Sequence, residues 1–207
     1  MVNILHIDSS PRAERSHSRE LSKEFVSSWK ATHPEDAIAY RDIGRHPIPH
    51  VDEAWIAAAF SPLETHTPEL TEAIRISDEL IDEFLAADRY IFGVPMYNFN
   101  IPSTFKAYID QIFRINRTFA IDAQGGLRGL VEGKKAVIIT ARGADFSATS
   151  PYAAYDFQEP YLRAVFGLIG LTDIQFINAN SLNEGDDART QSLSEARAAI
   201  QDAIAQW

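Results

Sequence analysis

The first segment whose residue types suit chemistry is the serine-rich run Ser9–Arg19, which joins a predicted strand to a predicted helix. Hydroxyls of Ser10, Ser16 and Ser18, free backbone N–H groups and the positive end of the helix dipole could surround a phosphate dianion without any glycine. The alternative is that Ser16 or Ser18 only caps the helix while the arginines of the run stay solvated. The segment alone leaves both interpretations open.

The second segment, Gly93–Ser103, is both aromatic and polar, and it follows the third predicted strand. Met96, Tyr97 and Phe99 offer flat apolar surfaces and Asn98 offers hydrogen-bonding groups, and a planar heteroaromatic ring needs both. Alternatively, the aromatic side chains only pack a corner between a strand and a helix. Here too, both interpretations remain open.

The third segment, Thr140–Ala144, contains Arg142 and Gly143 and follows the fourth predicted strand. A glycine at this place lets the backbone approach a ligand closely. An Arg-Gly turn is weak evidence by itself, but the three segments follow strands whose carboxyl ends are neighbours in the sheet predicted below. One ligand could therefore contact all three.

Several other motifs are absent. No G-x-G-x-x-G follows the first strand, and Gly129–Lys135 lacks the spacing and the Ser or Thr of a P-loop, which disfavours a dinucleotide-binding fold and a P-loop NTPase. No G-x-S-x-G is present, so the serines lack the context of a hydrolase nucleophile. His46 and His50 flank prolines rather than share a helix face, and we predict no metal site. Without cysteine, redox chemistry requires a bound cofactor.

The elements that must position these segments are apolar, β-rich runs that alternate with amphipathic stretches, as in a parallel sheet covered by helices. We predict one α/β domain over residues 1–207, a flavodoxin-like, doubly wound, five-stranded parallel sheet of order 2-1-3-4-5. The predicted strands are Val2–Asp8, Ala37–Asp42, Tyr90–Val94, Lys135–Thr140 and Thr172–Asn178. The predicted helices are Ser18–Ala31, Pro68–Ala87 with Thr67 as N-cap, Pro102–Arg114, Tyr155–Ile169 and Ser192–Ile204.

Two connections, residues 43–67 and 115–133, exceed the usual length of loops in such a sheet, and both are candidates for pocket walls or a dimer interface. The formal net charge of −10 would repel nucleic acids and anionic lipid surfaces, so neither is an expected partner. No apolar run is long enough to span a membrane, and Met1–Asp8 has the pattern of a core strand rather than a signal peptide. We therefore expect a soluble, cytoplasmic protein.

The segments Ser16–Ser18, Pro95–Ile101 and Arg142–Gly143, together with Gly133–Ala136 and Gly167–Asp173, resemble the FMN-dependent NADH azoreductase and quinone reductase family over nearly the whole chain. The resemblance implies three groups of FMN-binding residues. Those for the phosphate are Ser10, Ser16, His17 and Ser18; those flanking the isoalloxazine are Met96, Tyr97, Asn98 and Phe99; those along its pyrimidine edge are Ala141, Arg142, Gly143 and Ala144. The chain has Ala141 and Ala144 at both ends of the family's usual Ser-Arg-Gly-Gly, which removes one hydroxyl and adds one Cβ.

The resemblance also implies a function. NADH or NADPH, bound transiently, delivers hydride to flavin N5, and a quinone or azo compound then takes the place of the nicotinamide on the same face, so turnover is ping-pong and no side chain is a catalytic group. Family members form homodimers with the flavin pocket at the subunit interface. A flavodoxin-type electron carrier without NAD(P)H turnover is the rival interpretation, and a flavin-free regulatory protein is a more distant one.

Overall fold

A central parallel sheet organises the chain, of which the computed structural model describes all residues, 1–207. Its strands are β1 (Asn3–Asp8), β2 (Ala37–Asp42), β3 (Arg89–Pro95), β6 (Lys135–Ala141) and β7 (Asp173–Ala179). They lie in the order β2-β1-β3-β6-β7, and every neighbouring pair is parallel. Numbered along the chain this order is 2-1-3-4-5, so the predicted α/β topology is confirmed.

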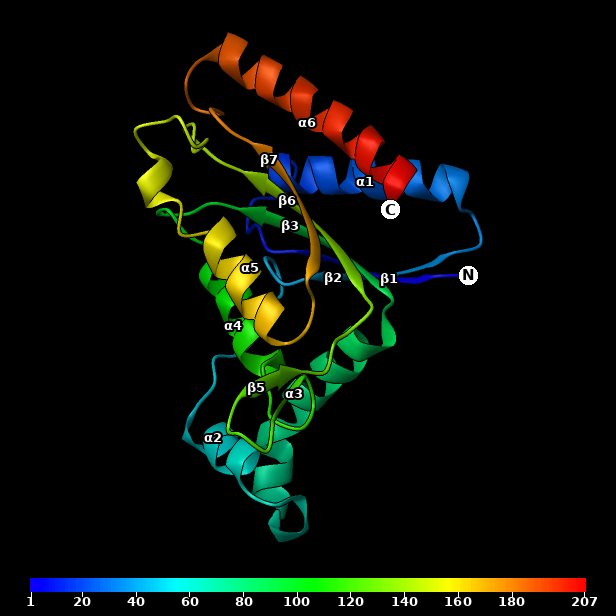
Figure 1. Ribbon diagram of the computed structural model, residues 1–207, viewed down its shortest axis with the longest axis vertical. Helices are drawn as coiled ribbons and strands as arrows, with labels where there is room; N and C mark the ends of the chain where they lie inside the picture. The colour runs from blue at the N-terminus through cyan, green and yellow to red at the C-terminus, as the bar shows by residue number, and fades with distance from the viewer.

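Helices cover both faces of the sheet (Figure 1). On one face lie α1 (His17–Thr32) and α6 (Asp186–Gln206); on the other lie α3 (Pro68–Ala86), α4 (Ser103–Ile112) and α5 (Glu159–Leu168). Alternate residues of β3 enter the two cores: Tyr90 and Phe92 pack on the α3–α5 side and Ile91 on the α1–α6 side. This two-sided burial explains why β3 and β6 are nearly continuous apolar runs.

The two long connections contain short elements that the sequence analysis did not predict. Residues 43–67 include α2 (Glu53–Phe60) and a 3₁₀ turn, η1 (Leu63–Thr65), and residues 115–133 include a hairpin of β4 (Phe119–Ile121) and β5 (Leu127–Gly129). A second 3₁₀ turn, η2 (Ala153–Tyr155), precedes α5. Strands of three residues are too short to display an alternating pattern, which is why this hairpin escaped prediction.

Helix boundaries follow local capping chemistry. Thr67 caps α3 as predicted, because its hydroxyl accepts a hydrogen bond from the backbone N–H of Leu70. The predicted start of α5 at Tyr155 was wrong, since the carboxylate of Asp156 accepts hydrogen bonds from the backbone N–H groups of Gln158 and Glu159 and the helix begins only at Glu159. A turn held by the Asp156 side chain therefore separates the 3₁₀ turn from the helix, whose N-cap is Gln158.

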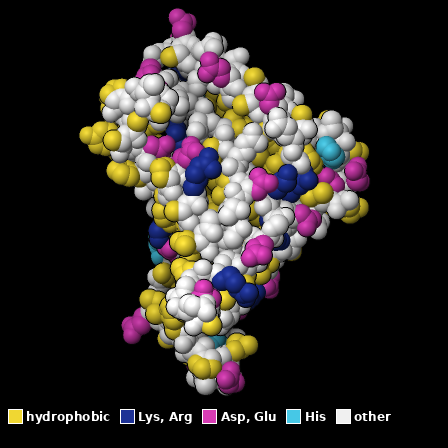
Figure 2. All heavy atoms as spheres, viewed as in Figure 1, with side chains coloured by type: hydrophobic (Ala, Val, Ile, Leu, Met, Phe, Trp, Pro, Cys, Tyr) yellow, Lys and Arg dark blue, Asp and Glu magenta, His cyan; other side chains and the backbone are white.

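The loops that carry the candidate site leave the carboxyl edge of the sheet, on the left in Figure 1, whereas both chain termini lie on the right. Hydrophobic side chains gather on the left of the molecular surface, over the segment between β6 and α5, and again at the lower end around α2 (Figure 2). None of the helices combines the length and the apolar composition needed to cross a lipid bilayer.

Candidate functional site

A hollow of about 180 Å³ lies at the carboxyl edge of the sheet, where the loops after β1, β3, β6 and β7 meet. Its wall consists of Ser10, Arg12, Ser16, His17, Pro95, Met96, Tyr97, Ala141, Arg142, Gly143, Leu182 and Asn183. The three segments singled out in the sequence thus converge on one place. In a chain of net charge −10 this wall contains no Asp or Glu and does contain Arg12, so it suits an anionic ligand.

The start of α1 supplies free hydrogen-bond donors to this hollow. Ser16 is the N-cap, with an extended backbone at φ −100° and ψ 111°. No acceptor in the chain is found for the backbone N–H groups of His17 and Ser18, which are the first two residues of α1. These N–H groups stand at the positive end of the helix dipole, the usual setting for phosphate binding.

The sequence left open whether Ser16 caps the helix or binds a ligand, and the structure is compatible with both roles. Its hydroxyl oxygen accepts from the backbone N–H of Arg19 at 3.5 Å, a long distance for a cap, and the residue also lines the hollow. Ser18 differs, because it is fully buried and its hydroxyl lies 3.2 Å from that of Ser16 without lining the hollow. Ser18 therefore offers its backbone N–H at the helix start, with its hydroxyl behind Ser16.

The segment after β3 forms a tight turn that is closed by reciprocal backbone hydrogen bonds between Tyr97 and Asn100, at 2.9 and 3.1 Å. Asn98 and Phe99 occupy the left-handed region, with φ of 48° and 69°. A bulky residue rarely adopts this conformation, and such strain is concentrated at functional sites. Met96 and Tyr97 line the hollow, whereas Asn98 and Phe99 do not; Asn98 lines a neighbouring cavity of about 530 Å³ that it shares with Tyr97.

Arg142 has its guanidinium committed inside the protein, with the side chain only 1% exposed. Its Nε donates to the side-chain oxygen of Gln158 at 3.0 Å and its Nη1 to the carboxylate of Asp156 at 3.0 Å. Burial lowers the pKa of this guanidinium, and the carboxylates of Asp156 and Glu159 oppose that effect. The Arg142 side chain therefore anchors the segment before α5, and its buried Nη2 has no hydrogen-bond partner in the chain.

That anchored segment presents aromatic side chains beside the hollow. The backbone N–H of Phe157 donates to the carbonyl of Phe99 at 3.1 Å, and the Phe99 and Tyr155 rings lie 5.6 Å apart. Tyr152 also belongs to this exposed group, and each of these four side chains is at least 44% exposed. A cluster of exposed aromatics next to a hollow is typical of a binding surface.

The loops after β6 and β7 close the remaining side. No acceptor in the chain is found for the backbone N–H groups of Gly143 and Ala144, although Ala144 does not line the hollow. The N–H groups of Leu182 and Asn183 donate to the carbonyls of Arg142 and Gly143, at 3.1 and 2.9 Å. Sequence reasoning missed Leu182 and Asn183. The signal that could have identified them is the polar run after the fifth predicted strand. In the predicted sheet order this strand lies beside the fourth, so its loop ends next to the Arg142 segment.

Residues 43–67 and 115–133, the two long connections, do not line the hollow. Within one chain, the prediction that they form the walls of this pocket is therefore wrong. Instead, α2 packs against α3 through Trp55, Ala58 and Ile74. Both connections do expose apolar side chains, among them Phe60 on the first and Ile121 on the second. Their other suggested role, as part of a dimer interface, stays a prediction.

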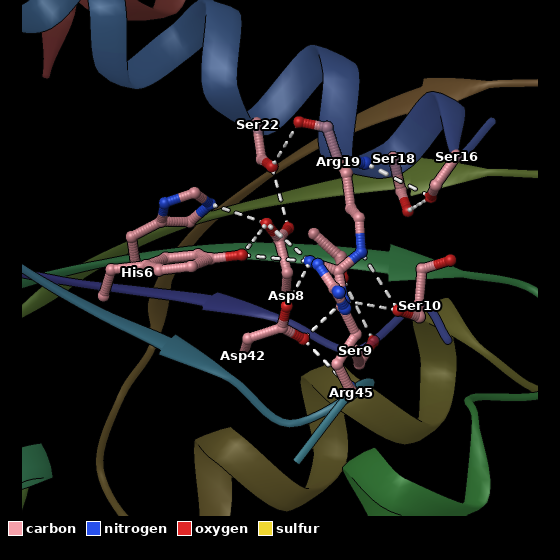
Figure 3. Close-up of polar contacts among 12 residues, drawn as sticks. His6, Asp8, Ser9, Ser10, Ser16, Ser18, Arg19, Ser22, Asp42 and Arg45 are labelled. Carbon is pink, nitrogen blue, oxygen red and sulfur yellow. Dashed lines mark hydrogen bonds and ion pairs between the residues drawn. The ribbon is translucent and has the colours of Figure 1, made fainter. Parts of the chain in front are cut away.

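A larger groove of about 720 Å³ lies on the opposite side of the Ser9–Arg19 loop. Its wall combines the acidic residues Asp8, Glu14, Glu20 and Asp42 with the basic residues Arg19, Lys23 and Arg45. Because the acidic residues of the groove outnumber its basic ones, whereas the smaller hollow has no acidic residue, the hollow is the better anion site in spite of its size. Figure 3 shows three of these residues, Asp8, Arg19 and Asp42, with their side chains pointing toward one another.

Comparisons with known proteins identify the family and the fold. A family model described as a flavodoxin-like fold matches residues 2–204. The chain is 87% identical over 207 residues to an FMN-dependent NADH:quinone oxidoreductase from Nostoc punctiforme and 65% identical over 208 residues to one from Trichormus variabilis, with complete coverage of both chains in each case. A crystal structure of an FMN-dependent NADH-azoreductase from Bacillus anthracis in complex with FMN has a TM-score of 0.90 and 25% identity, covering 100% of this chain and 99% of the other.

Proposed function

Because the chain belongs to the family of FMN-dependent NADH:quinone oxidoreductases with the flavodoxin-like fold, we propose that it reduces quinones with NADH through bound FMN. The observation that carries this proposal is the acid-free hollow, in which free helix N–H groups meet an aromatic turn at the carboxyl edge of the sheet. A phosphorylated, planar cofactor needs both features in one place.

The residues present fit FMN in a defined way. We propose that Ser10, Ser16 and His17, with the backbone N–H of Ser18, hold the phosphate. Met96 and Tyr97, with the turn at Asn98 and Phe99, flank the isoalloxazine. The backbone of residues 141–144, where the N–H groups of Gly143 and Ala144 lack internal acceptors, would lie along the pyrimidine edge. Bound FMN supplies the hydride chemistry, so the chain's own residues bind, orient and cover it, and none acts as a proton-transfer group.

We further propose that the protein acts as a homodimer. The hollow of about 180 Å³ is smaller than the roughly 300–1,000 Å³ of typical cofactor pockets, so one chain covers only part of a flavin. The exposed aromatics beside the hollow and the apolar side chains of residues 43–67 and 115–133 are suited to contact a second copy. Sedimentation at micromolar concentration tests this proposal: we expect a dimer, and a fully active monomer would refute an obligatory interface site.

A single flavin face would have to serve NADH and the electron acceptor in turn, so we propose ping-pong turnover. Initial rates at several fixed quinone concentrations should give parallel double-reciprocal lines, and intersecting lines with a demonstrable ternary complex would rule the shared site out. We include azo compounds in the proposed range, because flat apolar slots discriminate by only about 1–3 kcal/mol per contact. We also include NADPH, because the sequence has no dinucleotide fingerprint that selects one nucleotide. Because NADH is generated in the cytoplasm, we place the enzyme there, which cell fractionation tests.

The proposed phosphate site is tested by comparing FMN with riboflavin, which lacks the phosphate. If the Ser16 hydroxyl is a direct ligand, Ser16→Ala should weaken FMN binding by about 10- to 150-fold and leave riboflavin binding nearly unchanged. If the serine only caps the helix, the variant should lose about 1 kcal/mol of stability and keep its preference for FMN. Substitution of Asn98 is the control, since it should weaken both flavins through the ring.

A flavodoxin-type electron carrier is the second candidate, because it would share the sheet and the FMN. The family relationship favours the enzyme. Oxidation of NADH with a soluble quinone separates the two: we expect sustained turnover by the FMN-loaded protein, whereas a carrier would bind FMN without oxidising NADH.

A further inference from the structure

Arg19 is the third residue of α1, and its guanidinium reaches back to the loop that leads into the helix (Figure 3). We propose that Arg19, held by Asp42, is the positioning residue that fixes Ser10 for binding of the FMN phosphate. This inference rests on the proposed function, since it concerns the same flavin site. It assigns Arg19 an indirect role, in which the side chain orients the phosphate loop without contacting the phosphate.

The guanidinium of Arg19 uses every donor that it has. Its Nε donates to the carbonyl oxygen of Ser10 at 3.0 Å, and its Nη2 donates to the same oxygen and to the carboxylate of Asp42. Its Nη1 donates to the other carboxylate oxygen of Asp42 at 2.8 Å and to the hydroxyl of Tyr40 at 3.0 Å. Arginine has five N–H donors, so no donor remains for a phosphate.

The far side of this arrangement is anchored in the sheet through Asp8, which is 3% exposed. The carboxylate of Asp8 accepts hydrogen bonds from Ser22 at 2.8 Å and from the Tyr40 hydroxyl at 3.0 Å, and it lies 3.7 Å from Arg19. Burial and the neighbouring Asp8 raise the pKa of Tyr40 to about 12, so its hydroxyl keeps the proton that it donates. The position of Arg19 is therefore set by β1 and β2 together.

The loop after β2 packs against the Ser10 carbonyl through Gly44. Gly44 donates its backbone N–H to the carbonyl of Asp8 at 3.1 Å, and a Cβ on Gly44 would lie 2.1 Å from the carbonyl oxygen of Ser10 and 2.9 Å from the Arg19 guanidinium. Arg19 and Gly44 thus enclose the Ser10 carbonyl from two sides. A peptide group held in this way cannot turn without breaking the contacts on both.

The direction of that carbonyl matters for an anion. Arg19 lines the groove on one side of the loop and is absent from the wall of the hollow, whereas Ser10 lines the hollow. By holding the Ser10 carbonyl oxygen on the groove side, Arg19 keeps a partial negative charge away from the phosphate site. A phosphate dianion gains from that orientation and an uncharged ribityl end does not, so Arg19 should set the preference for FMN over riboflavin.

Titration of apoprotein with FMN and with riboflavin, followed by flavin fluorescence, tests the inference. Lysine cannot reproduce the fork of five donors. We expect Arg19→Lys to weaken FMN binding by about tenfold or more and riboflavin binding by less than about twofold. Asp42→Asn should shift the same preference less, and the double variant should bind FMN no more weakly than Arg19→Lys alone, because both changes act on one unit.

Arg197→Lys is the matched control, since Arg197 of α6 also pairs with α1, through Glu20 and Glu24, but on the exposed side. It should leave the FMN-to-riboflavin preference unchanged. The inference would be overturned if a folded Arg19→Lys protein kept the FMN-to-riboflavin preference of the wild type, or if Arg197→Lys lost as much of that preference. If Arg19→Lys does not fold, the preference measured for Asp42→Asn decides in the same way. If the wild-type protein itself binds riboflavin as tightly as FMN, the proposed phosphate site fails and this inference fails with it.

Discussion

Gly44→Ala tests the packing behind the candidate phosphate site with the smallest change available. A Cβ at this position would lie 2.1 Å from the carbonyl oxygen and 2.4 Å from the carbonyl carbon of Ser10. Both atoms are backbone, so no side-chain rotation relieves the clash, and the backbone segments of Gly44 and Ser10 must move apart. The backbone of Gly44 is not in the left-handed region, so this effect is steric.

The magnitude follows from that displacement. Overpacking of this kind costs about 1–3 kcal/mol, which a domain of ordinary stability, about 5–15 kcal/mol, survives. Moving Ser10 should also remove at least one hydrogen bond to the phosphate, and a bond to a charged group contributes about 1.5–3 kcal/mol. We therefore expect Gly44→Ala to fold, to lose about 1–3 kcal/mol of stability and to bind FMN about 10- to 150-fold more weakly.

Urea unfolding and FMN titration measure the two effects, and Gly167→Ala is the matched control. A Cβ on Gly167, near the end of α5, meets nothing within 4 Å. This control should gain about 0.5–1 kcal/mol from the helix preference of alanine and bind FMN normally. A Gly44→Ala protein that binds FMN like the wild type would refute the view that the Ser10 backbone must stay in place.

Three further predictions concern the same site. Arg142→Leu should cost about 3–5 kcal/mol in urea unfolding, because it leaves the carboxylate of Asp156 without its buried partner. Gly143→Ala should weaken FMN and riboflavin equally in titrations, and by less than Gly44→Ala weakens FMN, because the new Cβ would lie 2.6 Å from the side-chain amide of Asn183, which can rotate away. Burial raises the pKa of Asp42, but hydrogen bonds from Arg19 and from the Arg45 backbone outweigh it and hold that pKa below its usual value. The ionised Asp42 carboxylate therefore stabilises the folded protein fully above a pH of about 4, and this contribution is lost as the pH falls through the lowered pKa. In acid unfolding, the difference in free energy of unfolding between wild type and Asp42→Asn should therefore become smaller as the pH falls.

The sheet was predictable because both of its faces are buried. β3 and β6 are apolar along nearly their whole length, and Thr67 before Pro68 marks the start of α3. The hairpin of residues 119–129 and helix α2 were not predictable, since three-residue strands show no period and two turns of helix are held by tertiary contacts through Trp55. Local signals fail where tertiary contacts decide the structure.

The candidate site was predictable to the level of its loops. Sheet order was enough to bring Ser16, Tyr97 and Gly143 to one hollow. Side-chain directions were not predictable: Arg142 resembles a ligand-edge residue in sequence, yet its guanidinium points to Asp156 inside the protein. The role of Arg19 depends on β2 placing Asp42 beside α1, a contact between distant residues that no local motif encodes.

The central claim, that this chain passes electrons from NADH to a quinone through bound FMN, is tested most directly by anaerobic mixing of the FMN-loaded protein. We predict that stoichiometric NADH bleaches the visible absorbance of the bound flavin within the time of one turnover, and that a soluble quinone added afterwards restores it. A purified protein that does not retain FMN, or a bound flavin that keeps its colour in the presence of NADH, would contradict the account.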